Sequence, residues 1–244
     1  MPPFPLPTVR VHGLDYLDAD PSSLARLLEE RLSAPEQTTI FTPNAKIAGD
    51  ACRDADLQAL LQKADLLLPD GAGILLASRR ASRRPLTHRL PGIEAGEMTL
   101  ALAARHGHSV YFLGGRPDVA RLAAAAWQKR LPSLLVAGTH HGYFDRDGTE
   151  NEAVLTGIRA SRARVLLVCL GFPAQERWIL HNQDALPDVR LFLGLGGSFD
   201  VWAGKARRAP ALFRALHSEW LWRMLAEPRR FAQFPSLIRY VRGR

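Results

Sequence analysis

The chain has 244 residues and a mass of 27.0 kDa, and 47% of its residues are hydrophobic, enough to bury one sizeable α/β core. This composition argues against a disordered protein and against a long coiled coil. Its two cysteines, Cys52 and Cys169, lack metal-site or redox spacing, which argues against a disulfide scaffold and favours a reducing compartment.

The N-terminal stretch "MPPFPLPTVR" is interrupted by proline and lacks the apolar segment of a signal peptide. No uncharged apolar stretch approaches the roughly 18 residues that a membrane-spanning helix needs. We therefore expect a protein that is neither secreted nor membrane-spanning.

Apolar runs alternate with helix-like stretches along the chain. The runs are "VRVHGLDYL", "TTIFT", "DLLLPD", "SVYFLGG", "LLVAG", "RVLLVCLG" and "VRLFLGLGG". Stretches with helical spacing lie between them, such as "SSLARLLEERL", "PDVARLAAAAWQKRL" and "AQERWILHNQDAL". This alternation predicts an α/β fold, with a mostly parallel sheet and helices on both of its faces, over residues 1–204.

Ligands bind outside the carboxyl ends of the strands in such a sheet, so the strand ends are candidate site residues. These ends are 42–44, 69–73, 114–115, 142–144, 171–176 and 194–197. Glycine at a strand-to-helix turn lets backbone N–H groups approach a phosphate. Gly114 and Gly115 are therefore a candidate diphosphate contact, although a Gly-Gly pair is more often simple turn geometry. The chain has no G-x-G-x-x-G fingerprint and no P-loop, which disfavours a dehydrogenase and a P-loop kinase.

Asp70 and Asn44 each allow two interpretations. Asp70 follows "DLLLP" and precedes Gly-Ala-Gly, so it could be a catalytic base at the edge of the sheet or the N-cap of the next helix. Asn44 could cap a helix in the stretch 45–62 or bind a hydroxyl or amide group.

The motifs "TPNAK", "LPDGAGI", "RLPGIE", "YFLGG", "HGYF", "LGFPAQERWI" and "GLGGSFDVWAGKARRAP", followed by "EWLWRMLAEPRR", resemble those of one bacterial family in the same order. It is the WecG/TagA/CpsF family, glycosyltransferase family 26. The resemblance runs from about residue 8 to residue 240. It implies a Rossmann-like enzyme that moves a sugar from a UDP-sugar to an undecaprenyl-diphosphate-linked sugar with inversion. The leading donor sugar is N-acetylmannosamine, and the expected location is the inner face of the plasma membrane.

The resemblance also implies roles for individual residues. Asp70 matches the proposed catalytic base, Thr42 and Asn44 match an active-site polar pair, and Gln175 matches a motif glutamine. The predicted substrate-binding residues are Gly71, Gly73, Arg83, Gly114, Gly115, Tyr143, Gly171, Gln175, Glu176, Arg207, Arg214 and Arg223. Tyr143 would line the uridine pocket, and core packing is the alternative for it.

An inverting transfer needs a base for the acceptor hydroxyl and stabilisation of the departing diphosphate. Asp-x-Asp pairs begin at Asp18, Asp54 and Asp145 and could hold a metal ion, but they resemble turns or a solvated helix face. We therefore expect arginines in place of a metal ion, since a guanidinium binds phosphate through two hydrogen bonds. No cofactor is expected beyond the sugar nucleotide, which is a substrate.

The net charge of +8 resides in residues 205–244, where Lys205 and nine arginines face two glutamates. Aromatic residues such as Tyr240 lie between the arginines. This mixture suits an anionic membrane surface, where each cation contributes about 1 kcal/mol. Phosphate contacts on nucleic acid, or a helical cap with its aromatics on the core, are alternatives. A second cluster at 79–89 has five arginines and no acid, which suits the acceptor's diphosphate, the membrane or a solvated loop.

The chain departs from the family pattern in three places. Ala174 stands where lysine is frequent, Glu94 stands where aspartate is common, and "HSEW" at 217–220 replaces Gly-Leu-Glu-Trp. A UDP-glucose or UDP-uronic acid donor in exopolysaccharide assembly is therefore an alternative. A second alternative is a non-catalytic nucleic-acid-binding protein or membrane scaffold. We expect no nucleic-acid partner, and the sequence leaves homo-oligomer formation open.

Overall fold

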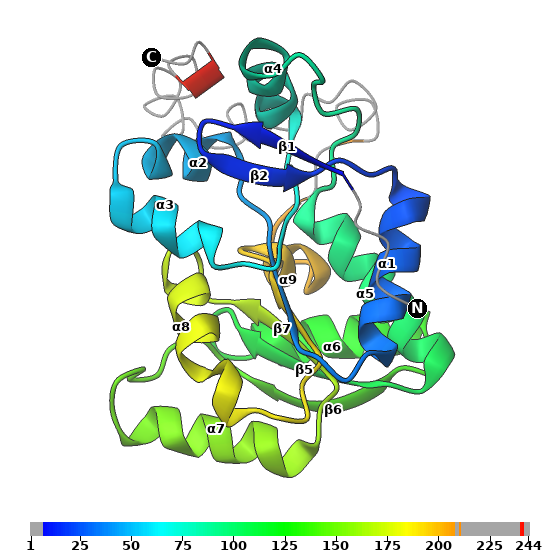
Figure 1. Cartoon of the computed structure of the whole chain (residues 1–244). Helices are drawn as coiled ribbons and strands as arrows, with labels where there is room; N and C mark the ends of the chain where they lie inside the picture. The colour runs from blue at the N-terminus through cyan, green and yellow to red at the C-terminus, as the bar shows by residue number, and fades with distance from the viewer. Residues whose placement is uncertain (1–6, 208–209, 211–239, 242–244) are drawn as a thin grey trace. The chain divides into compact units, whose positions relative to one another are not determined.

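The computed structural model describes residues 7–207, Pro210 and Tyr240–Val241 (Figure 1). The chain divides into two compact units. Unit 1 comprises residues 1–23, 42–91 and 208–244, and unit 2 comprises residues 24–41 and 92–207. Most of the predicted C-terminal appendage lies outside the described residues, so its boundary at residue 204 stays a prediction.

Unit 2 is built on five parallel strands in the spatial order β3-β8-β7-β5-β6. They are β3 (Thr38–Phe41), β5 (Ser109–Gly114), β6 (Leu135–His140), β7 (Val165–Cys169) and β8 (Leu191–Gly194). Strands β3, β7 and β8 are buried along their whole length. Continuous burial is typical of parallel strands that helices cover on both faces. The predicted mostly parallel α/β architecture is confirmed.

Helices precede, connect or follow these strands along the chain (Figure 1). They are α1 (Pro21–Ser33), α5 (Gly92–His106), α6 (Val119–Arg130), α7 (Thr149–Ser161), α8 (Ala174–Asn182), the 3₁₀ helix η1 (Gln183–Ala185) and α9 (Ser198–Trp202). The first three residues of α1 belong to unit 1. Helix α1 buries Leu24, Leu27, Leu28 and Leu32, the spacing of an amphipathic helix. Among the described residues, no helix combines the length and the apolar composition that spanning a membrane requires.

Unit 1 holds the hairpin of β1 (Thr8–Val11) and β2 (Leu14–Leu17), and β2 runs parallel to β4 (Leu66–Leu67). The apolar run 9–17 is therefore two strands. His12 and Gly13 turn the chain with φ values of 48° and 85°, a pair of positive values typical of a tight hairpin.

Two helices occupy the stretch 45–62 of unit 1, namely α2 (Ala45–Ala51) and α3 (Ala55–Gln62). They are separate because Asp54 caps α3, its side chain accepting hydrogen bonds from the N–H groups of Asp56 and Leu57. The third helix of unit 1 is α4 (Ala72–Ala81), which packs on β1.

Gly114, at the end of β5, has a φ of 131°, and a Cβ atom there would lie 2.3 Å from the carbonyl oxygen of Cys169. We expect Gly114→Ala to destabilise the protein more than Gly107→Ala. Gly107 has a φ of 69° with open space around it, so alanine there costs only the left-handed backbone penalty of about 1–2 kcal/mol. Urea unfolding of both variants measures the difference, and equal losses would contradict the steric argument.

Candidate active site

The predicted base and polar pair lie together in unit 1. Thr42 and Asn44 follow β3, and Asp70 follows β4. Asn44 and Asp70 are partners in an isolated parallel bridge. Thr42 is buried, whereas Asn44 and Asp70 are half-buried. The pairing of the two segments therefore brings the three predicted catalytic residues to one strand edge, and their catalytic roles stay predictions.

Asn44 is the N-cap of α2. Its side-chain oxygen accepts hydrogen bonds from the N–H groups of Lys46 at 3.0 Å and Ile47 at 3.1 Å. The capping interpretation is confirmed for this residue. An asparagine amide has separate acceptor and donor atoms, so the cap occupies Oδ1 and leaves the Nδ2 group for a different contact.

Gly71, rather than Asp70, is the N-cap of α4. Its φ of 94° and ψ of 165° fall in a region that only glycine adopts without strain. Asp70 therefore stands one residue before the cap, at the point where the chain turns from the β4 segment into α4. Gly73 lies in the first turn of α4 and is half-buried. Substrate contacts of Gly71 and Gly73 stay predictions.

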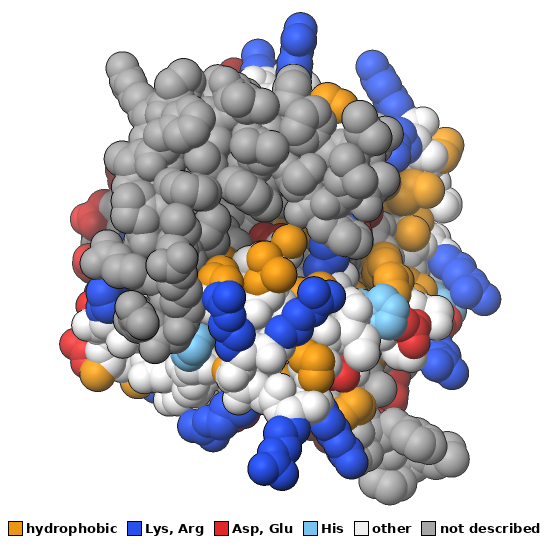
Figure 2. Space-filling view, turned by 90° about the horizontal axis from the view of Figure 1, so that it is seen from above, with side chains coloured by type: hydrophobic (Ala, Val, Ile, Leu, Met, Phe, Trp, Pro, Cys, Tyr) orange, Lys and Arg blue, Asp and Glu red, His pale blue; other side chains and the backbone are white. Residues whose placement is uncertain are grey.

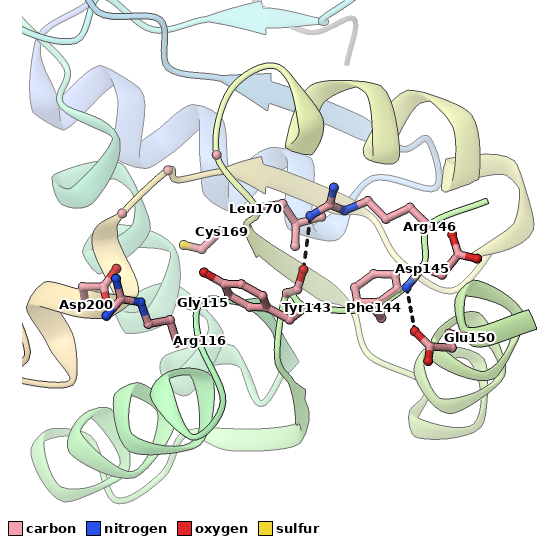
Figure 3. A pocket seen from close by; sticks show the side chains of 14 residues that line it. Gly115, Arg116, Tyr143, Phe144, Asp145, Arg146, Glu150, Cys169, Leu170 and Asp200 are labelled. Carbon is pink, nitrogen blue, oxygen red and sulfur yellow. Dashed lines mark hydrogen bonds between the residues drawn. The ribbon is translucent and has the colours of Figure 1, made fainter. Parts of the chain in front are cut away.

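Unit 2 contains a pocket of about 790 Å³ at the carboxyl ends of its strands (Figure 3). Its lining residues are Gly115, Arg116, Gly142, Tyr143, Phe144, Asp145, Arg146, Glu150, Cys169, Leu170, Gly171, Gly196, Gly197 and Asp200. They come from the last residue of β7 and from the segments that follow β5, β6, β7 and β8. A volume of this size is typical of sites for small molecules, and the position is the one expected for ligands of parallel sheets.

Backbone hydrogen bonds join the loops around this pocket. The Gly115 N–H donates to the Cys169 carbonyl at 2.9 Å, and the Gly142 N–H donates to the Gly115 carbonyl at 2.8 Å. A Cβ atom on Gly142 would lie 3.2 Å from the Gly114 Cα, so the loops after β5 and β6 approach closely at glycine. Three of the predicted contacts, Gly115, Tyr143 and Gly171, line the pocket. Gly114 lies just before it, in the strand.

Gln175 and Glu176 are buried beside the pocket and do not line it. The Gln175 side chain accepts a hydrogen bond from the Gly196 N–H at 3.0 Å and donates one to Glu176 at 2.9 Å. The structure thus shows Gln175 fixing the loop after β8, which contributes Gly196 and Gly197 to the pocket. A direct substrate contact of Gln175 or Glu176 stays a prediction.

Burial raises the pKa of Glu176 from its usual 4.5 to about 7, and the hydrogen bond from Gln175 offsets part of this rise. Between about pH 4.5 and pH 7 the folded protein therefore keeps the proton on the Glu176 carboxyl group, whereas the unfolded chain has lost it. The corresponding stability is complete below about pH 4.5 and is lost as the pH rises to about 7.

We expect Glu176→Gln to remove this part of the pH dependence, because glutamine is neutral throughout. Thermal unfolding of wild type and variant between these pH values measures it, with exposed Glu30→Gln as the control. A variant that retains the wild-type pH dependence would show that Glu176 does not titrate in this range.

Aromatic and charged side chains face the pocket (Figure 3). Tyr143 is 67% exposed, so the core-packing alternative for it is wrong. Its ring extends toward Arg116 and Asp200, while Phe144 and Arg146 lie on the opposite side of Tyr143. Arg146 donates a hydrogen bond to the Gly142 carbonyl at 3.1 Å, and the Asp145 N–H donates to Glu150 at 2.6 Å.

Sequence reasoning missed the charged lining residues Arg116, Asp145, Arg146, Glu150 and Asp200. The sequence did contain a signal for Arg116 as a site residue, since Arg116 directly follows the predicted Gly-Gly contact. Asp145 lies in "DRDG", which was interpreted as a turn. The turn itself is confirmed, because the Asp147 N–H donates to the Asp145 side chain at 3.1 Å. The Cys169 thiol at the pocket stays protonated, because burial raises its pKa far above the usual value.

The remaining predicted contacts lie elsewhere. Arg83 is exposed in unit 1 after α4, and Arg207 is exposed at the end of unit 2. Arg214 and Arg223 lie outside the described residues. Among the described residues, no group of three or more His, Cys, Asp or Glu side chains is arranged to hold a metal ion. Independence from metal ions stays a prediction.

Sequence comparison adds an independent finding. The family described as glycosyl transferase WecG/TagA/CpsF matches residues 9–242. This chain belongs to that glycosyltransferase family. Proteins of Staphylococcus aureus strains MRSA252, COL and N315 are each 33% identical to it over 234 residues, which is 94% of this chain and 89% of theirs. All three are named N-acetylglucosaminyldiphosphoundecaprenol N-acetyl-beta-D-mannosaminyltransferase.

Membership of this family establishes the class of reaction that the protein catalyses. This glycosyltransferase is an enzyme, so the alternative of a non-catalytic binding protein or scaffold is wrong. The match continues through the basic C-terminal segment to residue 242, and that segment is therefore part of what the family shares.

Proposed function

We propose that this glycosyltransferase moves N-acetylmannosamine from a UDP-sugar to an N-acetylglucosamine linked through diphosphate to undecaprenol. The observation that carries the proposal is the 33% identity over 94% of the chain to proteins named for this transfer. The proposal assigns the UDP part of the donor to the unit 2 pocket and the role of the base to Asp70 in unit 1.

The unit 2 pocket suits the UDP part of the donor. Its volume is about 790 Å³, and a Cβ atom on Gly171 or Gly196 would meet nothing within 4 Å, so the backbone there is open to close approach. The exposed Tyr143 ring offers a flat surface for the uracil base. Arg116 follows the Gly-Gly turn and offers a planar cation for phosphate oxygens.

Asp70 would serve as the base for the acceptor. As the acceptor oxygen bonds to the anomeric carbon, its proton passes to the Asp70 carboxylate. The bond from the anomeric carbon to the diphosphate breaks at the same time, and UDP leaves with the electron pair. A single displacement of this kind inverts the anomeric centre, and one positioned base is sufficient for it.

The charge on the departing diphosphate would be met by cations and backbone N–H groups in place of a metal ion. Arg207 is an exposed candidate among the described residues, and Arg214 and Arg223 remain candidates from the sequence. EDTA should therefore leave turnover unchanged. Inhibition by EDTA that manganese reverses would contradict this part of the proposal.

A lipid-linked acceptor would require the enzyme to work at a membrane. We propose the inner face of the plasma membrane, where the basic segment 205–244 would lie on anionic lipid. A different donor, UDP-glucose or a UDP-uronic acid, is the alternative. The observation that favours it is Ala174, which opens α8 next to Gln175 and lacks the cation frequent at this position in the family.

A donor screen tests the proposal. Purified protein is heated with each UDP-sugar and assayed for UDP release with a short-lipid diphosphate-linked N-acetylglucosamine. We expect stabilisation by UDP and turnover with UDP-N-acetylmannosamine. Turnover with another donor only would select the alternative, and no response to any uridine nucleotide would overturn the UDP assignment.

A further inference from the structure

We propose that the C-terminal half of α4 and the loop behind it bind the anionic headgroups of a phospholipid membrane. This surface, called the α4 patch, consists of Leu76, Arg79, Arg80 and Arg84. The proposal rests on the proposed function, because a lipid-linked acceptor requires the enzyme to work at a membrane. It adds a membrane contact in unit 1 whose residues lie outside the basic segment 205–244.

Helix α4 has two distinct faces. Ile74, Ala77 and Ser78 are buried. Leu76, Arg79 and Arg80 are exposed at the same spacing on the opposite face. Leu76 is 46% exposed and, together with Leu135 and Tyr143, is one of the three large hydrophobic residues exposed in the described part of the chain. A leucine among arginines suits a membrane surface, where the leucine enters the acyl boundary and the guanidinium groups meet phosphates.

The loop behind α4 is held in place by hydrogen bonds. The Ser78 hydroxyl accepts from the Leu86 N–H at 3.1 Å, and the Ser82 hydroxyl accepts from the Arg84 N–H at 3.2 Å. Thr87 donates to the Asp18 carboxylate from both its backbone N–H and its hydroxyl. Arg84 therefore extends the basic surface of the helix from a fixed position.

The arginines of the α4 patch have no acidic partner among the described residues. Residues 71–93 contain no acidic residue, and no ion pair joins Arg79, Arg80 or Arg84 to a carboxylate within the described residues. In contrast, Arg121 pairs with Asp118 and Arg159 with Glu152. Arginines in a last helical turn also balance the helix dipole. That role explains neither the exposed Leu76 nor Arg84, which lies beyond the helix.

Val241, a described residue of the basic C-terminal segment, lies at the α4 patch. The Arg80 guanidinium donates a hydrogen bond to the Val241 carbonyl at 3.1 Å. Tyr240 is buried, with its ring 5.0 Å from that of His12, so for this aromatic the core-packing alternative is confirmed. Arg242 and Arg244 follow in the sequence and lie outside the described residues. Lysine and arginine side chains extend outward from the described surface, with hydrophobic side chains among them (Figure 2).

The position of the α4 patch also fits the proposed chemistry. Asp70 lies just before α4, and Arg79 is nine residues later, about 13 Å along a helix axis. Headgroups at the patch would hold the membrane surface about one helix length from the base. This is a suitable reach for an acceptor sugar that a diphosphate joins to its lipid.

Vesicle binding tests the proposal with the full chain. We expect Arg79→Gln/Arg84→Gln to lower the partition coefficient on phosphatidylcholine vesicles containing phosphatidylglycerol about tenfold or more. The matched control, Arg121→Gln/Arg159→Gln, loses the same charge from ion-paired positions and should bind like wild type. Equal binding by all three proteins, or equal losses in both variants, would overturn the proposal. Arg83 is unchanged because it is a predicted substrate contact.

A local probe tests the same surface independently of net charge. In a Cys52→Ser background, Leu76→Cys carries a polarity-sensitive dye, and Leu135→Cys serves as the control because Leu135 is 52% exposed in unit 2. Anionic vesicles should shift the emission of the dye at 76 to the blue and leave that at 135 unchanged. No shift at 76, or equal shifts at both sites, would overturn the proposal.

The acceptor's diphosphate is the competing partner for these arginines. With a soluble short-chain acceptor and no vesicles, Arg79→Gln/Arg84→Gln should keep wild-type turnover. A loss of turnover there would assign the arginines to the acceptor and overturn the membrane assignment. If the proposed function is wrong, wild type will show neither stabilisation by UDP nor turnover. The vesicle-binding measurements do not depend on that result and can still be interpreted.

Discussion

We expect Asp70→Asn to lower turnover by about 10²–10⁴-fold, the contribution typical of a positioned general base. Asparagine has almost the same shape but cannot take the proton of the acceptor hydroxyl. The bridge between residues 44 and 70 is formed by backbone, and the glycine cap of α4 is retained, so the fold should be preserved. Initial rates at saturating donor and acceptor measure the effect, and thermal shifts with UDP measure retained binding.

Asp54→Asn is the matched control for this variant. Asp54 is an exposed N-cap in the same unit, and asparagine caps a helix as well as aspartate does. The control should keep wild-type turnover. If Asp70→Asn also kept it, the base would have to be a different residue.

The second large effect is expected from Gly197→Trp. Gly197 lines the unit 2 pocket, has a φ of −97° and would carry a Cβ atom with nothing within 4 Å. A side chain is therefore compatible with the backbone and would occupy pocket space. At a UDP concentration 100 times its dissociation constant, wild type should gain about 2.7 kcal/mol of stability. Gly197→Trp should gain none at that concentration and should lose turnover.

Gly197→Ala distinguishes two effects of the tryptophan variant, namely blocking of the pocket by the side chain and loss of the glycine itself. Alanine adds only the Cβ atom, so this variant should bind UDP as wild type does. Full UDP stabilisation of Gly197→Trp, with a folded variant, would show that the nucleotide does not use this pocket. Loss of binding in Gly197→Ala would instead indicate that the Gly196–Gly197 backbone itself contacts the ligand.

Local sequence patterns predicted the parallel architecture and most strand ends, because the spacing of hydrophobic residues and the presence of turn residues are local properties of the sequence. They failed at His12-Gly13, where positive φ values turn one apolar run into a hairpin. They also joined α2 and α3, because Asp54 was interpreted as part of a helix face although its side chain caps the second helix. In both places turn or capping residues interrupted an otherwise favourable hydrophobic period.

The sequence by itself determined the class of this protein. Its ordered motifs and parallel α/β pattern are carried by residues near one another in the chain, and they pointed to a family of glycosyltransferases. Only the tertiary structure decided that Gln175 holds the Gly196 loop, that Arg116 and Asp200 face one pocket, and that Tyr240 is anchored in unit 1. These contacts join segments that are distant in sequence. Burial and hydrogen bonding between such segments follow from strand order and helix packing, which no local pattern specifies.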